Sequence, residues 1–182
     1  MNAVFDSNNY LIVDKFISLE EAESLYKEFV VLPNVDPGIR DFQCPLSHSY
    51  YNHKPFLVLL NYKVAMLSDI LNEKLLPTYC YARVYNHGEE LKKHSDRPSC
   101  EISVTLNLGG DADWEIYITK PDGESVGVNL KPGQAMVYKG TVAEHWRNKF
   151  TGNKYAQVFL HYIRAYGEHA EHYYDRIETR RS

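Results

Sequence analysis

The stretch RVYNHGEELKKHSD, residues 83–96, decides the fold of this chain, and it ends in His94-Ser95-Asp96. A further histidine, His145, follows Asp96 at a distance of 49 positions. Successive side chains of an extended segment point to opposite faces, so His94 and Asp96 would project from the same side. Two imidazoles and one carboxylate can hold one divalent ion and leave its remaining positions open. The pattern therefore predicts a metal site made of His94, Asp96 and His145.

Short β-strands surround this stretch. Runs of apolar and β-branched residues between turn residues predict strands at 79–85, 101–108, 114–119, 125–130, 134–138 and 154–163. Two of the connections, KPDG (residues 120–123) and KPGQ (131–134), have the proline and glycine positions of β-turns. Many short strands after a helical region indicate an α+β protein. We expect a jelly roll with N-terminal helices packed on one sheet.

The segment before residue 79 mixes helices with short strands. Residues 10–13 predict a strand, and Ser18 and Glu21 form a capping box that begins a helix ending at about residue 30. Residues 33–53 are predicted to be a loop. A second helix is expected from Pro55 to a point before Pro77, with apolar residues at mostly helical spacing. These are Leu59, Val64, Leu67, Leu71 and Leu75.

The composition is that of a globular protein. The chain has 182 residues, 44% hydrophobic and 24% charged, which fits one domain over residues 1–182. We expect helical support over about 1–78, a jelly-roll core over about 79–163 and a charged tail over 164–182. The net charge of −4 predicts no attraction to nucleic acid or to an anionic membrane.

Apolar runs and cysteines predict the cellular location of the protein. No apolar run approaches the roughly 20 residues that span a bilayer, and residues 1–10 lack a signal-peptide core. Cys44, Cys80 and Cys100 are odd in number and show no CxxC spacing. Reduced thiols and a cytoplasmic location are therefore expected.

The order of these motifs resembles that of a known family. Arg83, Tyr85 and Gly88 precede the HxD at similar spacing, and LKPGQAMVY (residues 130–138) is similar to the turn and strand before the distal histidine. On these residues the chain resembles the Fe(II)/2-oxoglutarate-dependent dioxygenases, within them the prolyl 4-hydroxylase-like branch. The resemblance covers about residues 79–163.

The resemblance implies a double-stranded β-helix that holds Fe(II) on His94, Asp96 and His145. It implies 2-oxoglutarate and O2 as cosubstrates, stimulation by ascorbate, and hydroxylation of a C–H bond with release of succinate and CO2. Peptidyl proline is the substrate class that it favours, so a protein or peptide partner is expected. Two alternatives stay open: the same mechanism on a free amino acid, another side chain or another small molecule, and a non-catalytic metal-binding jelly-roll module.

The resemblance also implies residues that bind 2-oxoglutarate. A buried carboxylate must be paired, and Lys154, nine positions after His145, stands where the family has its cation. Lys154 shares strand parity with an aliphatic face that could line the barrel: Ala156, Val158 and Leu160. Arg147 is the rival, because a guanidinium pairs with a carboxylate through two hydrogen bonds. Tyr85 and Thr105 match family positions near the cosubstrate.

Two further expectations concern residues near the predicted site. Arg97 and Glu101 are expected to pair with each other across the turn at Pro98. His161 has the opposite parity from Lys154, which predicts a structural role for its side chain.

Overall fold

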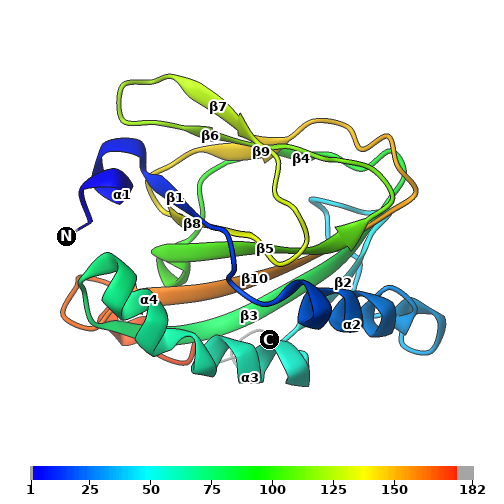
Figure 1. Ribbon diagram of the computed structural model, residues 1–182, viewed down its shortest axis with the longest axis horizontal. Coiled ribbons are helices and arrows are strands. Elements are labelled where there is room, and N and C mark those ends of the chain that lie inside the picture. Colours follow the sequence, from blue (N-terminus) through cyan, green and yellow to red (C-terminus); the bar gives the residue numbers. More distant parts are fainter. Residues whose placement is uncertain (1, 176–182) are drawn as a thin grey trace.

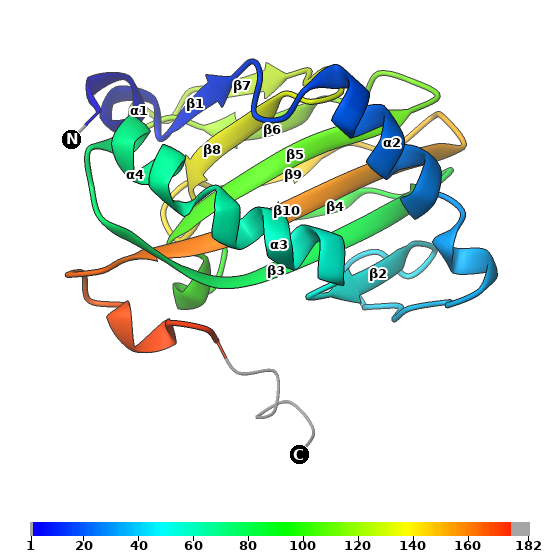
Figure 2. The same ribbon diagram turned by 60° about the horizontal axis from the view of Figure 1, so that its bottom comes forward.

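Residues 2–175 are described by the structure, which is a computed structural model. Two antiparallel sheets face each other, and helices cover the outer face of the larger sheet (Figures 1 and 2). The larger sheet has the order β1-β8-β5-β10-β3-β2, and the smaller has the order β4-β9-β6-β7. This α+β jelly roll with helices on one sheet is the fold that the sequence predicts.

The elements have the following bounds. The strands are β1 (Tyr10–Val13), β2 (His48–Tyr51), β3 (Leu75–Asn86), β4 (Leu91–His94), β5 (Ile102–Gly110), β6 (Ile116–Thr119), β7 (Ser125–Val128), β8 (Ala135–Lys139), β9 (His145–Arg147) and β10 (Lys154–Arg164). The helices are α1 (Ala3–Asn8), α2 (Leu19–Phe29), α3 (Lys54–Tyr62) and α4 (Val64–Leu71), with short 3₁₀ turns at Leu32–Asn34, Pro98–Cys100 and Ala170–His172.

The larger sheet has two buried faces. One face packs on α2, α3 and α4 through aliphatic side chains such as Val158 and Leu160 of β10. The other face carries Tyr81, Tyr85 and Phe159 into the space between the sheets. Burying an aliphatic side chain contributes about 1.5–3 kcal/mol, so the helices stabilise the sheet from outside while the space between the sheets is left for the site.

The N-terminal segment supplies both edges of the larger sheet. β1 pairs with β8, and β2 pairs with β3. The capping box is confirmed in part: the Ser18 hydroxyl accepts a hydrogen bond from the Glu21 backbone N–H at 3.0 Å and α2 begins at Leu19. This N-cap satisfies one N–H that the first helical turn leaves without a partner.

The second predicted helix is wrong at its C-terminal end. The structure has two helices that meet at Lys63, and Asn72 ends α4 in a left-handed conformation with φ of 53°. Leu75 then pairs with Arg164 in the sheet. Leu75 lies four residues after Leu71, a spacing that continues the helical pattern. Strand β3, which begins at Leu75, is buried on both faces, so its sequence lacks the alternation of polar and apolar residues that would indicate a strand.

The predicted loop over residues 33–53 also contains regular structure. It includes part of a 3₁₀ turn and the whole of β2, whose Tyr50 lies opposite Ala82 of β3. The short strand β9 was likewise not predicted. In the predicted tail, β10 continues to Arg164 and a 3₁₀ turn covers Ala170–His172. Residues 176–182 of that tail lie outside the described part of the chain.

Candidate metal centre

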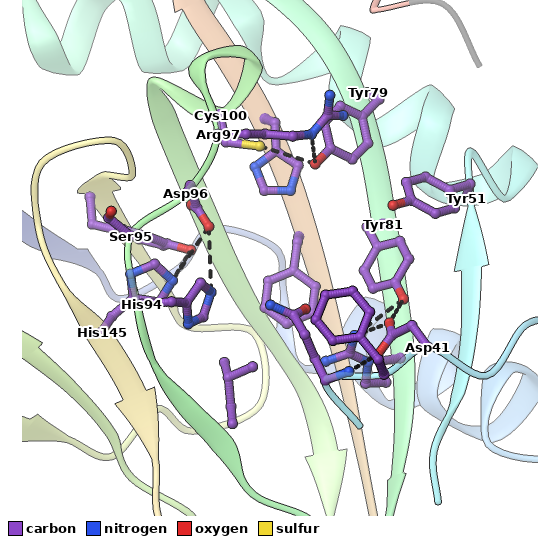
Figure 3. Close-up of a pocket in the computed structure, with 17 residues that line it drawn as sticks. Asp41, Tyr51, Tyr79, Tyr81, His94, Ser95, Asp96, Arg97, Cys100 and His145 are labelled. Carbon is purple, nitrogen blue, oxygen red and sulfur yellow. Dashed lines mark hydrogen bonds and ion pairs between the residues drawn. The ribbon is translucent and has the colours of Figure 1, made fainter. Parts of the chain in front are cut away.

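His94, Asp96 and His145 meet at one end of the smaller sheet. His94 and His145 are direct cross-strand partners of β4 and β9, with ring centroids 4.4 Å apart. Asp96 Oδ1 lies 3.7 Å from His94 Nε2 and 3.6 Å from His145 Nε2 (Figure 3). One donor atom from each of the three residues lies within 4.8 Å of the others. The predicted convergence is confirmed, and the role of the three as metal ligands stays a prediction.

Backbone carbonyls orient both imidazoles. His94 Nδ1 lies 2.7 Å from the Lys92 carbonyl oxygen, and His145 Nδ1 lies 3.0 Å from that of Ala143. A carbonyl oxygen only accepts, so each Nδ1 carries the proton and each Nε2 keeps its lone pair for a metal. Burial lowers the pKa of His145 below its usual value, despite the opposing effect of the Asp96 carboxylate. The histidine is therefore neutral at neutral pH, which is the form that binds metals.

A cavity of about 330 Å³ opens beside the three donors. Its far wall, seen in Figure 3, is aromatic and comes from β2 and β3, while Phe159 of β10 completes it. Tyr51 and Tyr81 have ring centroids 4.6 Å apart, and Tyr51 and Tyr79 5.7 Å apart. An apolar wall that faces a small group of convergent polar atoms is typical of a small-molecule or side-chain binding site. The strand positions of these tyrosines carried the signal, but the sequence interpretation assigned only Tyr85.

The loop before β2 is fixed to the barrel by a buried ion pair that sequence reasoning missed. Asp41 accepts a hydrogen bond from the guanidinium of Arg83, which also donates to Ser49 Oγ at 3.0 Å and to Tyr85 Oη at 3.2 Å. Burial alone would raise the pKa of Asp41, but Arg83 lowers it below its usual value. The adjacent Phe42 lines the cavity mouth and is 94% exposed. The ion pair therefore holds a large apolar side chain in solvent at the entrance.

The face predicted for Lys154 is wrong. Ala156, Val158 and Leu160 belong to the cluster that packs against the helices, not to the barrel interior. The residues of β10 that face inward have the other parity, such as Phe159 and His161. Lys154 instead lies at the N-terminal end of β10, where its Nζ donates to Asn86 Oδ1 at the end of β3. The argument from strand parity is thereby removed, whereas the position nine residues after His145 is unaffected, so the role of Lys154 stays a prediction.

Arg147 is a second buried cation, besides Arg83, and unlike Arg83 it does not line the cavity. It lies two positions after His145 on β9, and both side chains are buried at 2% exposure. Its guanidinium packs against the rings of Trp114 and Tyr155, with its Cζ 4.8 and 5.3 Å from the ring centroids. One nitrogen donates to the Trp114 carbonyl oxygen. Within residues 2–175, Nε and Nη2 of Arg147 have no hydrogen-bond partner.

Tyr85 and Thr105 are both buried and use their hydroxyls within the protein. Tyr85 Oη accepts a hydrogen bond from Arg83, and Thr105 Oγ1 accepts one from the amide of Gln157. Neither lines the cavity. Their predicted contact with a cosubstrate stays a prediction.

Arg97 and Glu101 do not pair with each other. Glu101 accepts hydrogen bonds from the backbone N–H and the guanidinium of Arg164. Arg97 pairs with Asp175 and stacks on Tyr79, with its Cζ 4.6 Å from the ring centroid. Both partners lie far away in the sequence, so the local spacing of the two residues misled the prediction.

The described chain has no helix long and apolar enough to cross a membrane. Cys44, Cys80 and Cys100 are all free and buried, in agreement with the absence of a disulfide framework.

Comparisons with known proteins identify the fold. No family model and no curated protein sequence matches the chain. A prolyl-4-hydroxylase from Pseudomonas putida superposes with a TM-score of 0.68 at 13% identity, over 88% of this chain and 95% of that one. HygX from Streptomyces hygroscopicus, solved with nickel and 2-oxoglutarate bound, superposes with a TM-score of 0.71 at 15% identity, over 90% and 85%.

A viral collagen prolyl hydroxylase from Paramecium Bursaria Chlorella virus-1, solved as its 2-oxoglutarate complex, gives a TM-score of 0.64 at 13% identity, over 88% of this chain and 98% of that one. The fold that the resemblance of residues 79–163 implies is thus confirmed across most of the chain. The chain has the jelly-roll fold of the Fe(II)/2-oxoglutarate-dependent oxygenases, including their prolyl hydroxylase-like branch.

Proposed function

We propose that this protein is an Fe(II)- and 2-oxoglutarate-dependent oxygenase. The observation that carries the proposal is the convergence of His94, Asp96 and His145, with donor atoms within 4.8 Å of one another, beside a cavity. Two imidazoles and one carboxylate on one side of an ion fit Fe(II) and leave positions for other ligands. With O2 as the oxidant, bound Fe(II) and 2-oxoglutarate would allow one oxygen atom of O2 to enter a C–H bond as an alcohol and the other to enter succinate, with release of CO2.

The buried guanidinium of Arg147 supports 2-oxoglutarate as the cosubstrate. A buried charge is costly unless it is paired and hydrogen-bonded, and two nitrogens of this side chain are unpartnered among the described residues. Arg147 and His145 share the inward face of β9, so about 7 Å of strand separates them. A short dicarboxylate could therefore contact the metal at one end and Arg147 at the other. Formation of succinate by the wild-type protein tests the proposal, and its absence with every substrate offered would contradict it.

Peptidyl proline is the substrate class that we propose for this site. A second cavity of about 370 Å³ adjoins the first, and Phe42 and Gln43 line both. An extended peptide could place one residue beside the metal donors and its neighbours in the second cavity. The aromatic wall of Tyr51, Tyr79 and Tyr81 suits the apolar faces of a pyrrolidine ring.

Mass spectrometry of a peptide library after turnover will test the residue specificity. We expect a mass gain of one oxygen atom on proline, because the aromatic wall can pack against its ring while the donors face an exposed C–H bond. The His94→Ala variant should give no such product. Oxidation confined to another residue, or to a free amino acid, would contradict the prolyl assignment and leave the proposed mechanism in place.

Replacing Phe42 by alanine is expected to raise the KM for a peptide substrate by about 10-fold, which corresponds to about 1.4 kcal/mol. Burial of a phenylalanine side chain against a ligand contributes about 1.5–3 kcal/mol. Because Phe42 is 94% exposed in the free protein, the free energy of unfolding and kcat should change little. Steady-state kinetics with a peptide measure the effect.

Tyr62→Ala is the matched control, since Tyr62 is an exposed aromatic residue on α3, on the opposite side of the larger sheet. Its KM should equal that of the wild type. An equal KM for Phe42→Ala would exclude the cavity mouth as the peptide-binding surface.

A further inference from the structure

The two carboxylate oxygens of Asp96 have different surroundings. Oδ1 faces the imidazoles of His94 and His145. Oδ2 accepts a hydrogen bond from the hydroxyl of Ser103 at 2.8 Å. Only one oxygen of this carboxylate is therefore directed toward the position that a metal would occupy.

Ser103 is itself held by His161. The two residues are direct cross-strand partners of β5 and β10, and Ser103 Oγ lies 2.9 Å from His161 Nδ1. The serine has one proton, and two acceptors lie within reach of it, Asp96 Oδ2 at 2.8 Å and the Cys100 carbonyl oxygen at 3.1 Å. A hydrogen bond to a carboxylate is stronger than one to a neutral group. Ser103 thus donates to Asp96, and Nδ1 of His161 must donate to Ser103. The result is a directed chain from His161 through Ser103 to Asp96, in which Ser103 is 0% and His161 5% exposed.

Gly140 leaves the space that this chain requires. A Cβ atom at this position would lie 2.5 Å from Asp96 Oδ2 and 2.7 Å from Ser103 Oγ. The backbone of the same residue accepts a hydrogen bond from the Asp96 N–H at 2.7 Å. Backbone and side chain of Asp96 are thus both fixed, in a slot that would exclude any larger residue in place of Gly140.

We propose that Ser103 and His161 are positioning residues that hold Asp96 as a ligand through one oxygen, so that Oδ2 does not occupy a second position on the metal. This inference rests on the proposed function, because it assumes the metal centre at His94, Asp96 and His145. A carboxylate that is free to rotate can bind a metal through both oxygens. Here such binding would take a position that the cosubstrate needs. His161, which the sequence assigned a structural role, also lines the cavity.

Metal affinity of the purified apoprotein, titrated with Co(II), provides the test. We expect Ser103→Ala to weaken Co(II) binding by about 10- to 100-fold, which is typical for loss of a group that orients a metal ligand. The visible spectrum of bound Co(II) should also change, because a second carboxylate oxygen raises the coordination number. Ser47→Ala is the matched control, since Ser47 is a buried serine whose hydroxyl has no hydrogen-bond partner among the described residues.

Two variants of His161 test the same chain of hydrogen bonds while Ser103 is kept. Asparagine can place an N–H near the position of Nδ1, so His161→Asn should keep most of the affinity, whereas His161→Leu should lose it as Ser103→Ala does. Wild-type affinity and spectrum in both Ser103→Ala and His161→Leu would overturn the inference alone. Wild-type protein that binds Co(II) no better than His94→Ala would overturn the proposed metal centre together with it.

Discussion

Replacing His94 by alanine is expected to abolish the weak visible charge-transfer band that Fe(II) and 2-oxoglutarate give with the wild-type protein under anaerobic conditions. The loss of one of three protein ligands should reduce the affinity for Fe(II) by at least about 100-fold, or about 2.8 kcal/mol. The side chain is 26% exposed, so its truncation leaves a smaller buried cavity than truncation of His145 would. The folded state should persist, which circular dichroism can verify.

His87→Ala is the matched control for this variant. His87 belongs to the same stretch of sequence and its Nδ1 lies 3.0 Å from the Gly152 carbonyl oxygen, but it is not part of the three-donor cluster and does not line the cavity. This variant should retain the band and the affinity. A wild-type protein that gives no band, or a His87→Ala variant that loses it as completely as His94→Ala, would contradict the assignment of the metal ligands.

The metal donors could be predicted from the sequence because their geometry is mostly local. His94 and Asp96 are two positions apart, and strand alternation alone places them on one side. His145 required the assumption that its strand returns to the same sheet, and the pairing of β4 with β9 bears this out. Turn chemistry was equally local: Gly133 has φ of 84°, as the KPGQ turn requires.

The face of a doubly buried strand could not be read in the same way. β10 has apolar residues at nearly every position, because one face meets helices and the other lines the barrel. Alternation of polar and apolar residues, which marks a half-exposed strand, is therefore absent. The sequence pattern placed the aliphatic face of β10, which includes Val158, toward the barrel interior. The structure shows that the opposite face, with Phe159 and His161, lines the cavity. The orientation became clear only from the contacts with α3 and α4.

Long-range partners explain the remaining differences. The ion pair of Arg83 with Asp41 joins residues 42 positions apart, and the hydrogen bond between Ser103 and His161 joins residues 58 positions apart. Nothing in the local spacing of these residues indicates a partner. The sequence therefore predicted the convergence of the three candidate metal ligands better than it predicted the groups that hold them in place.

Replacing Arg147 by methionine is expected to raise the 2-oxoglutarate concentration required for turnover by about 100-fold. Truncating one partner of a buried charge pair costs about 2–5 kcal/mol, and about 2.8 kcal/mol corresponds to that factor. Methionine keeps most of the apolar contact with Trp114 and Tyr155. Succinate formation as a function of 2-oxoglutarate concentration measures the change.

The Lys154→Met variant tests whether Lys154, and not Arg147, is the cation that binds 2-oxoglutarate. Lys154 contacts Asn86 at the end of β10, on the face opposite to the cavity, so its removal should leave the 2-oxoglutarate requirement unchanged. The reverse pattern, a large effect at Lys154 and none at Arg147, would restore the cation first predicted from its position after His145.

The free energy of unfolding, measured without 2-oxoglutarate, tests the role of Arg147 independently of turnover. In the free protein, Arg147 is a buried charge with two unpartnered nitrogens among residues 2–175, and replacing an uncompensated buried charge by an apolar side chain is often neutral or stabilising. The free energy of unfolding of Arg147→Met should therefore not fall, while the stabilisation that 2-oxoglutarate gives the wild type should be lost. A strongly destabilised Arg147→Met protein that still gains stability from 2-oxoglutarate would mean that the guanidinium supports the fold and not the cosubstrate.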